Sequence, residues 1–329
     1  MSKKDPNPIS RILPLGGARD ISAPFEPAPL QNKDVETISR AQIKEALLAA
    51  PRIFDNGGSR VVRLTSDTVV KYGREVDIWE GRNLRYVAEH TTIPVPKLYD
   101  YWEEIPEATP DLIDDGSTIC YIVMQYIEGS LSYDVYDESN ELQKSTVNKQ
   151  LSSYIAQLRH LKLDVPGPIG GGISNGGLFT SYGAGPFGSQ EDLETFFNEL
   201  LLVCQQFGRA RKDQVDFTDK LGPLVFCHMD LHLQNMILDK KGKLWILDWA
   251  CAGGYPEHFE SASIMRRGNP KYFKSLLEGM EADKHHEDID RLYNIGFALT
   301  TAQTLEAAKT PSPLAQAEKI PWPGFNTHP

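Results

Sequence analysis

The sequence contains few cysteines, no long apolar runs and no leader-like start. Its four cysteines form no C-x-x-C pair, and no Cys/His cluster has the spacing of a zinc site. This cysteine usage fits a reduced, cytosolic setting. No apolar run is long enough to span a bilayer, and the first ten residues, MSKKDPNPIS, lack the apolar core of a signal peptide. We therefore expect a cytoplasmic protein without a membrane partner.

Positive charge is also scarce. The chain has 34 Lys and Arg against 45 Asp and Glu, which gives a formal net charge of -11. Nucleic acid is therefore not an expected partner, because phosphate backbones require a basic surface. An acidic surface would instead attract a cationic small molecule. Nothing in the composition indicates an oligomeric state.

The distribution of residue types along the 329 residues predicts two lobes with short extensions. Residues 1–35 are rich in proline and polar side chains and are interpreted as an N-terminal arm. Residues 36–129 contain β-rich runs and two helical segments, and residues 130–310 are mostly helical. Residues 311–329 form a proline-rich tail. The expected fold class is therefore α+β, with a small β-rich N-terminal lobe and a larger helical C-terminal lobe.

Hydrophobic periodicity predicts the elements of both lobes. In the first lobe these are a helix near 35–50, strands at 60–64 and 68–71, a helix at 74–90, strands at 97–102 and 118–126, and a solvated loop at 103–116. In the second lobe they are helices at 146–161 and 191–207, a hairpin at 236–248 and further helices from 257 to 308. The Gly- and Pro-rich stretch 165–188 is predicted to be a long irregular loop, either a lid or simply a variable segment.

The strongest chemical signal is the segment from His228 to Asn235, HMDLHLQN, followed by a hairpin that ends in Asp248. Pairing about a turn at 239–244 would place Asn235 opposite Asp248, so that two oxygen ligands suited to Mg²⁺ meet at the mouth of the hairpin. Asp230, on the loop leading in, could orient an acceptor hydroxyl and take its proton. The alternative is an unrelated Asp/Asn pair beside a surface hairpin.

A lysine and a glutamate in the first lobe complete this set. Lys71 ends a predicted strand, from which a lysine can reach nucleotide phosphates. Glu80 lies four residues from both Val76 and Leu84, on the apolar stripe of the next helix. An inward carboxylate needs a charged or hydrogen-bonded partner, and Lys71 is the natural one. Glu75 is the alternative partner, and an ordinary edge-strand lysine is the alternative interpretation of Lys71.

A glycine-containing turn precedes the first of these strands. Its residues are Asn56, Gly57, Gly58 and Ser59. Backbone N–H groups in such a turn could contact phosphates. The full G-x-G-x-x-G pattern is missing, so a plain turn is an equally good interpretation.

These motifs resemble those of a known family. The spacing H-x-D-x-x-x-x-N is that of the protein-kinase catalytic loop, but Met229 replaces the arginine and Trp249-Ala250 follows the second aspartate in place of Phe-Gly. With both departures the sequence resembles the aminoglycoside phosphotransferase and choline kinase group. More specifically, it resembles fungal proteins with an aminoglycoside phosphotransferase domain. The segments 91–96 (TTIPVP), 124–129 (MQYIEG) and 252–256 (AGGYP) fit the same pattern, and the resemblance covers roughly residues 50–300.

The resemblance implies a protein-kinase-like fold and transfer of the γ-phosphoryl group of ATP, with Mg²⁺, to a hydroxyl or amine of a small molecule. It places Met124 at the back of the adenine pocket, and Gln125 and Ile127 would supply backbone hydrogen bonds to adenine. His228 would hold the catalytic loop by a hydrogen bond. Lys71 would bind phosphates, with Glu80 positioning it.

Three other functions remain open. A protein kinase should show an A-P-E-like segment after Asp248, and none appears. A nucleotide-binding scaffold without turnover, and an enzyme that uses the fold for other chemistry, are not distinguished by sequence.

The acceptor pocket is not identified by the sequence. Five acidic residues of the second lobe could line it, although each also fits a solvated helix charge: Glu257, Glu260, Asp283, Glu287 and Asp288. His232 could contact the acceptor or lie on the surface. The pair His285-His286 lies in a charged stretch, which favours solvated side chains over a metal site.

Overall fold

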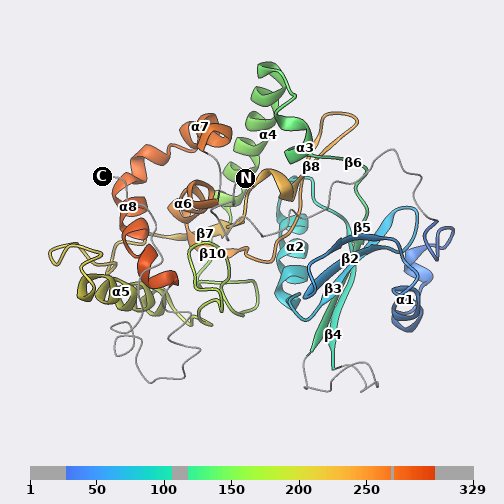
Figure 1. The fold of residues 1–329 in the computed structure, drawn as a ribbon, viewed down its shortest axis with the longest axis horizontal. Coiled ribbons are helices and arrows are strands. Elements are labelled where there is room, and N and C mark those ends of the chain that lie inside the picture. The colour runs from blue at the N-terminus through green and yellow to red at the C-terminus, as the bar shows by residue number, and fades with distance from the viewer. Residues whose placement is uncertain (1–26, 106–117, 268–269, 301–329) are drawn as a thin grey trace, which may run out of the picture.

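The structure is a computed structural model that describes residues 27–105, 118–267 and 270–300 (Figure 1). Within these ranges the chain forms a β-rich lobe and a mainly helical lobe, so the predicted α+β fold class is confirmed. Most of the predicted arm, most of the predicted loop 103–116 and the whole predicted tail lie outside the described residues.

The N-terminal lobe is built on one antiparallel sheet of five strands in the order β1-β2-β3-β5-β4. The strands are β1 (Arg52–Asp55), β2 (Ser59–Arg63), β3 (Thr68–Gly73), β4 (Leu98–Glu104) and β5 (Ile119–Gln125). Side chains alternate across β5. Tyr121 and Val123 pack with α1 (Arg40–Ala46), whereas Cys120 and Ile122 pack toward the segment that starts α2 (Ile78–His90). The two helices therefore cover opposite faces (Figure 1).

Two helices of this lobe are shorter than predicted. The helix expected at 74–90 begins only at Ile78, because Gly73 adopts a φ of 152° and Asp77 occupies the N-cap position in an extended conformation. The helix expected near 35–50 is limited to a 3₁₀ turn, η2 (Val35–Thr37), and α1. Ser39 starts α1 through a capping box with Gln42.

The C-terminal lobe surrounds two small sheets with helices. The helices are α3 (Ser132–Tyr136), α4 (Glu141–His160), α5 (Gln190–Gln206), η3 (Leu233–Asn235), α6 (Glu257–Arg267), α7 (Pro270–Gly279), η4 (Ala282–His285) and α8 (His286–Asn294). The strands are β6 (Gly129–Leu131), β7 (Leu224–Cys227), β8 (Met236–Asp239), β9 (Leu244–Ile246) and β10 (Gly253–Pro256). One sheet is β6-β8-β9, and the other is the antiparallel pair β7-β10.

Capping explains where the long helices begin. Helix α4 begins five residues before the predicted start, because Asn140 and Gln143 form a capping box. Helix α5 begins at Gln190, next to a second capping box between Ser189 and Asp192. The apolar stripe of α4 faces the core, as its periodicity predicted, with Leu151 and Ile155 buried.

The Gly- and Pro-rich segment 165–188 is anchored rather than free. Gly167 and Gly254 exchange two backbone hydrogen bonds of 2.8 and 3.0 Å, and Ser174 pairs with Ala184 in the same way. Leu178 and Phe179 of this segment are buried in the core of the C-terminal lobe. These contacts favour a fixed structural segment over a lid.

We propose a boundary between the lobes next to Gly129. The chain leaves the five-stranded sheet after Gln125 and enters β6, which pairs with β8 of the other lobe.

Among the helices in the described ranges, none has both the length and the apolarity needed to cross a membrane.

Candidate active site

A buried ion pair joins β3 to α2. The Nζ atom of Lys71 lies 2.8 Å from Oε1 and 2.7 Å from Oε2 of Glu80, and the side chains are 12% and 5% exposed. The predicted pair is therefore present. Glu75, the alternative partner, packs instead against the turn before β2, with its side chain next to Gly58.

Lys71 also reaches across to the C-terminal lobe. Its Nζ atom lies 3.1 Å from Oδ1 of Asp248. Burial disfavours the charge on Lys71, but the attraction of Asp248 and Glu80 outweighs burial and raises the pKa of Lys71. The ammonium group thus stays charged and joins a carboxylate from each lobe. Asp248 has a φ of 59°, a left-handed conformation that is uncommon for a residue with a side chain.

The hairpin register differs from the prediction by one residue. Met236 pairs with Ile246, and the N–H of Leu247 donates to the carbonyl of Asn235 at 2.9 Å. Asn235 is therefore opposite Leu247 and not opposite Asp248. The prediction was wrong because Leu238, and not Asp239, pairs with Leu244 at the turn, which moves the whole register by one residue.

Asp230 and Asn235 are in direct contact within the segment 228–235, which corresponds to the predicted catalytic loop. The amide Nδ2 of Asn235 donates to the carbonyl of Asp230 at 3.1 Å and to its Oδ2 at 3.2 Å. Both residues are buried, and the Asp230 side chain is 11% exposed. The ring of His232 lies 3.5 Å from Oδ2 of Asp230, with 15% exposure, so His232 is part of the site and not a surface residue.

His228 holds this loop through two hydrogen bonds, as the resemblance implies. Its Nε2 lies 3.0 Å from the carbonyl of Leu247, and its Nδ1 accepts from the N–H of Asp230 at 3.2 Å. Burial lowers the pKa of His228, so the ring is neutral and carries its proton on Nε2. The ring also packs on Trp249, with centroids 4.5 Å apart.

Glu260 is a support for the loop and not an acceptor-wall residue. It is 2% exposed, and its carboxylate accepts the N–H of His228 at 2.6 Å and that of Met229 at 3.2 Å. The hydroxyl of Ser263 donates to the carbonyl of Met229. Met229 has a φ of 65°, so helix α6 holds a strained residue of the loop from both sides. The sequence shows Glu260 only as one acidic residue among several.

Asn83 connects α2 to the segment after Asp248. Its Nδ2 donates to the carbonyls of Trp249 and Ala252 at 2.9 and 2.8 Å, and its Oδ1 accepts the N–H of Ile169 at 3.0 Å. The side chain is fully buried. Asn83 lies three residues after Glu80, on the same side of the helix. In the sequence, only its position on the inward face of the helix pointed to Asn83, and Asn83 was not among the predicted site residues.

Replacement of Asn83 by alanine is expected to lower the free energy of unfolding by about 2–4 kcal/mol, because buried donors and acceptors lose their partners. Glu89→Ala, at an exposed position of the same helix, is the control and should change it by less than about 0.5 kcal/mol. Urea unfolding monitored by circular dichroism measures both. Equal stability of the two variants would show that the three hydrogen bonds of Asn83 are unimportant.

The turn before β2 is closed by its own side chains. Oδ1 of Asp55 accepts the N–H of Gly57 at 2.9 Å. Oδ1 of Asn56 accepts the N–H groups of Gly58 and Ser59 at 3.1 and 2.6 Å. The amides that were predicted as candidates for phosphate contact are therefore occupied, and the structure favours the plain turn.

Residues 125–128 link the two lobes, and the first two of their backbone N–H groups have acceptors. The N–H of Gln125 donates to Lys97 at 2.8 Å, and that of Tyr126 donates to Asp67 at 2.7 Å. The N–H of Ile127 makes no hydrogen bond to any residue in the described ranges. Met124, one residue before Gln125, is partly buried on the face of β5 that packs toward α2.

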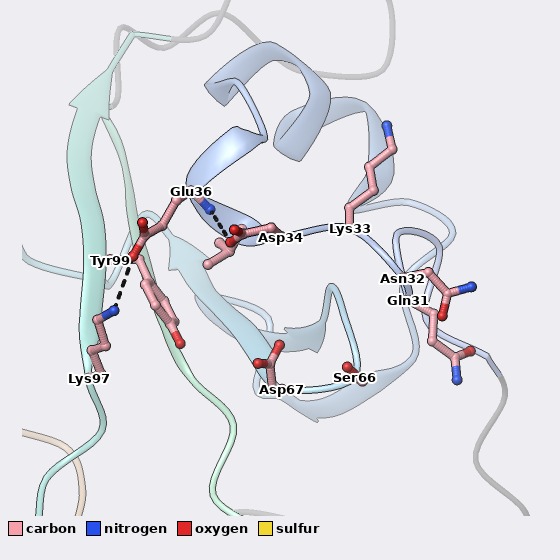
Figure 2. Close-up of a pocket in the computed structure, with 10 residues that line it drawn as sticks. Gln31, Asn32, Lys33, Asp34, Glu36, Ser66, Asp67, Lys97 and Tyr99 are labelled. Carbon is pink, nitrogen blue, oxygen red and sulfur yellow. Dashed lines mark hydrogen bonds and ion pairs between the residues drawn. The ribbon is translucent and has the colours of Figure 1, made fainter.

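The remaining predicted acceptor residues do not form one wall. Asp283 and Glu287 are exposed, whereas Glu257 and Asp288 gather around His285. A separate hollow lies between the residues before α1, the β2–β3 turn and β4, where Lys97 pairs with Glu36 at 3.1 Å (Figure 2). None of the predicted site residues lines this hollow.

Comparisons with known proteins identify the family. Residues 52–294 match the model of the phosphotransferase enzyme family, APH. The fold is similar to wild-type aminoglycoside 2'-phosphotransferase-IIIa in its GDP complex, with a TM-score of 0.53 and 10% identity over 82% of this chain and 90% of that chain. It is also similar to the gentamicin complex of APH(2'')-IIa, with a TM-score of 0.50 and 12% identity over 85% and 95% of the two chains. The comparison with curated proteins finds no match.

These similarities define a protein with the kinase-like fold of aminoglycoside phosphotransferases. The family model covers well over half of the chain, so the protein belongs to the phosphotransferase enzyme family. The resemblance inferred from the sequence motifs is therefore confirmed at the level of the family.

Proposed function

We propose that the protein transfers the γ-phosphoryl group of ATP to a hydroxyl, or less often an amine, of a small molecule, in a reaction that requires Mg²⁺. The observation that supports this most is the buried Lys71, which holds Glu80 of one lobe and Asp248 of the other. A lysine fixed in this way places one positive charge where the two lobes meet, as binding of nucleotide phosphates requires.

In this proposal the nucleotide binds between the lobes. Lys71 contacts its phosphates, and Glu80 keeps the ammonium group in position. The adenine ring lies against Met124, where the carbonyl of Gln125 accepts a hydrogen bond and the N–H of Ile127 donates one. The unused N–H of Ile127 supports this arrangement. We leave Gly57, Gly58 and Ser59 out of the site, because their amides are already occupied.

The side chains of Asn235 and Asp248 fit a magnesium ion. The Asp248 carboxylate is 28% exposed, and the amide nitrogen of Asn235 is turned to Asp230, which leaves its oxygen for another partner. Carboxylate and amide oxygens are the hard ligands that Mg²⁺ takes in nucleotide sites. Asp248 and Asn235 would hold the ion, which neutralises charge on the phosphates when it is bound.

Asp230 is the proposed general base. Asn235 donates to its Oδ2 and His232 lies beside it, so the carboxylate is held in one orientation. It would accept a hydrogen bond from the acceptor hydroxyl and take its proton as the phosphoryl group is transferred. Most of the rate enhancement would come from positioning and charge stabilisation.

A small and cationic acceptor is favoured by two observations. The net charge of -11 attracts cations. A protein of the same fold is known in complex with gentamicin.

ATP is expected to raise the melting temperature only together with Mg²⁺, because the proposed site holds the phosphates partly through the ion. A ligand that binds only the folded state stabilises it by about 2.7 kcal/mol at a hundredfold excess over Kd. A thermal-shift series with ATP or GTP, with and without Mg²⁺, measures this. Lys71→Met should lose the shift, whereas Lys97→Met, at a lysine with 61% exposure, should keep it. No shift with either nucleotide would refute the proposal.

A further inference from the structure

Three side chains that could bind a metal ion converge at one end of helix α6. They are His258 in the first turn of α6, His285 at the end of η4, and Asp288 in the first turn of α8. One ring nitrogen or carboxylate oxygen from each lies within 4.8 Å of the others. The sequence suggested that His285 is a solvated residue in a charged stretch, but the fold makes it part of this cluster.

The partners of His285 orient its ring as metal-bound histidines are oriented. Its Nε2 lies 2.7 Å from Oε1 of Glu257, and its Nδ1 faces Oδ2 of Asp288 at 3.8 Å. The other oxygen of Asp288 accepts from Arg291 at 2.7 Å. A metal-binding histidine usually donates its second N–H to a carboxylate, and bound carboxylates are themselves hydrogen-bonded. Glu257 and Arg291 therefore leave Nδ1 of His285 and Oδ2 of Asp288 as the two inward atoms.

His258 completes the cluster with a buried ring. It is 3% exposed. Its ring centroid lies 5.7 Å from that of His285, in a stacked arrangement. A bound cation would give this buried ring a polar partner.

We propose that His258, His285 and Asp288 form a binding site for a divalent transition-metal ion, with Zn²⁺ as the expected ion. Imidazole nitrogen and carboxylate oxygen bind Zn²⁺ at about 2.0–2.2 Å, which puts two ligands of a tetrahedral site about 3.4 Å apart. The three ligand atoms lie within 4.8 Å of one another, so no pair of them must close by more than about 1.4 Å. The side chains of His285 and Asp288 are 25% and 28% exposed, so they have room to move and an ion has a route in.

The site is structural and separate from the reacting groups. Pro256, just before Glu257, pairs with Leu224 at the end of β7 that is remote from His228. The ion would join α6 to η4 and α8. Glu260, two residues after His258, holds the backbone of the catalytic loop, so the ion would also steady the helix that supports this loop. The proposal does not depend on which reaction the protein catalyses.

Zn²⁺ binding to the full chain, freed of any histidine tag and treated with EDTA, tests this site. We expect one ion per chain in a competition titration with a fluorescent chelator. The melting temperature should rise by about 3–6 °C at a hundredfold excess over Kd. Co²⁺ in place of Zn²⁺ should give the visible absorption of a low-symmetry site with nitrogen and oxygen ligands.

Matched variants distinguish this site from adventitious binding. His285→Ala and Asp288→Asn should each weaken Zn²⁺ binding by about 100-fold or more, and Glu257→Gln by about 10–100-fold. His286→Ala, at the adjacent exposed histidine, should bind as tightly as the unmodified protein. Circular dichroism of the metal-free variants shows whether each is folded. If His285→Ala does not fold, Asp288→Asn still tests the site, because asparagine keeps an acceptor for Arg291. Equal affinity of all folded variants, or no binding by the unmodified chain, would overturn the proposal.

Discussion

Replacement of Asp230 by asparagine is expected to lower kcat by about 10²–10⁴-fold, the usual contribution of a positioned general base. The amide keeps the size of the side chain and an oxygen that can accept from Asn235, which now bonds to Oδ2 at 3.2 Å. It cannot take a proton from the acceptor. Because Lys71 and Asp248 are untouched, the affinity for ATP should remain within about threefold of the original value, or about 0.7 kcal/mol.

Three measurements on this variant separate a base from a structural residue. Turnover with a known acceptor, ATP affinity by calorimetry and melting temperature are compared with those of Asp283→Asn, at an exposed aspartate of the same lobe. Lost turnover with intact binding and stability supports the base role. A parallel loss of stability and ATP affinity would make Asp230 a structural residue, and retained turnover would refute the base role.

Replacement of Asp248 by asparagine is expected to reduce turnover by at least about 10²–10³-fold, similar to the loss of other groups that stabilise transition-state charge. The change removes the charge from the proposed magnesium site and one of the two carboxylates next to Lys71. Glu80 still holds the lysine, so the fold should be retained. The variant should also need much more Mg²⁺ for half-maximal activity.

A magnesium titration of activity at saturating ATP tests the role of Asp248. The assignment predicts an increase in the Mg²⁺ requirement for Asp248→Asn and none for Asp283→Asn. Normal turnover at the normal Mg²⁺ concentration would show that Asp248 does not hold the ion.

Local patterns in the sequence were sufficient for much of the fold. The apolar stripes of α4 and α5, and the β-rich runs of the first lobe, follow from side-chain periodicity that burial then satisfies. The short strands β7 and β10 were not predicted, because four residues buried on every side show no alternation. The start of α2 was misplaced because Val76 is buried although it lies outside the helix.

The site was predictable where its chemistry depends on spacing and not where it depends on contacts between distant segments. The pairing of Lys71 with Glu80 followed from the unfavourable burial of a carboxylate on an apolar stripe. Asn83 and Glu260 act through hydrogen bonds to backbone groups 166 and 32 residues away, which leave no local pattern. The hairpin register was wrong by one residue because a turn motif does not show where the ladder ends.

The most direct test of the account is the fate of the γ-phosphoryl group. The protein is incubated with γ-labelled ATP, Mg²⁺ and a protein-free extract of small metabolites, and the products are separated by mass. The account predicts label in a small molecule that is heavier by one phosphoryl group, together with ADP, and no such product with Asp230→Asn. Label found only on protein, or ATP left unchanged while the thermal shift shows that it binds, would contradict the central claim.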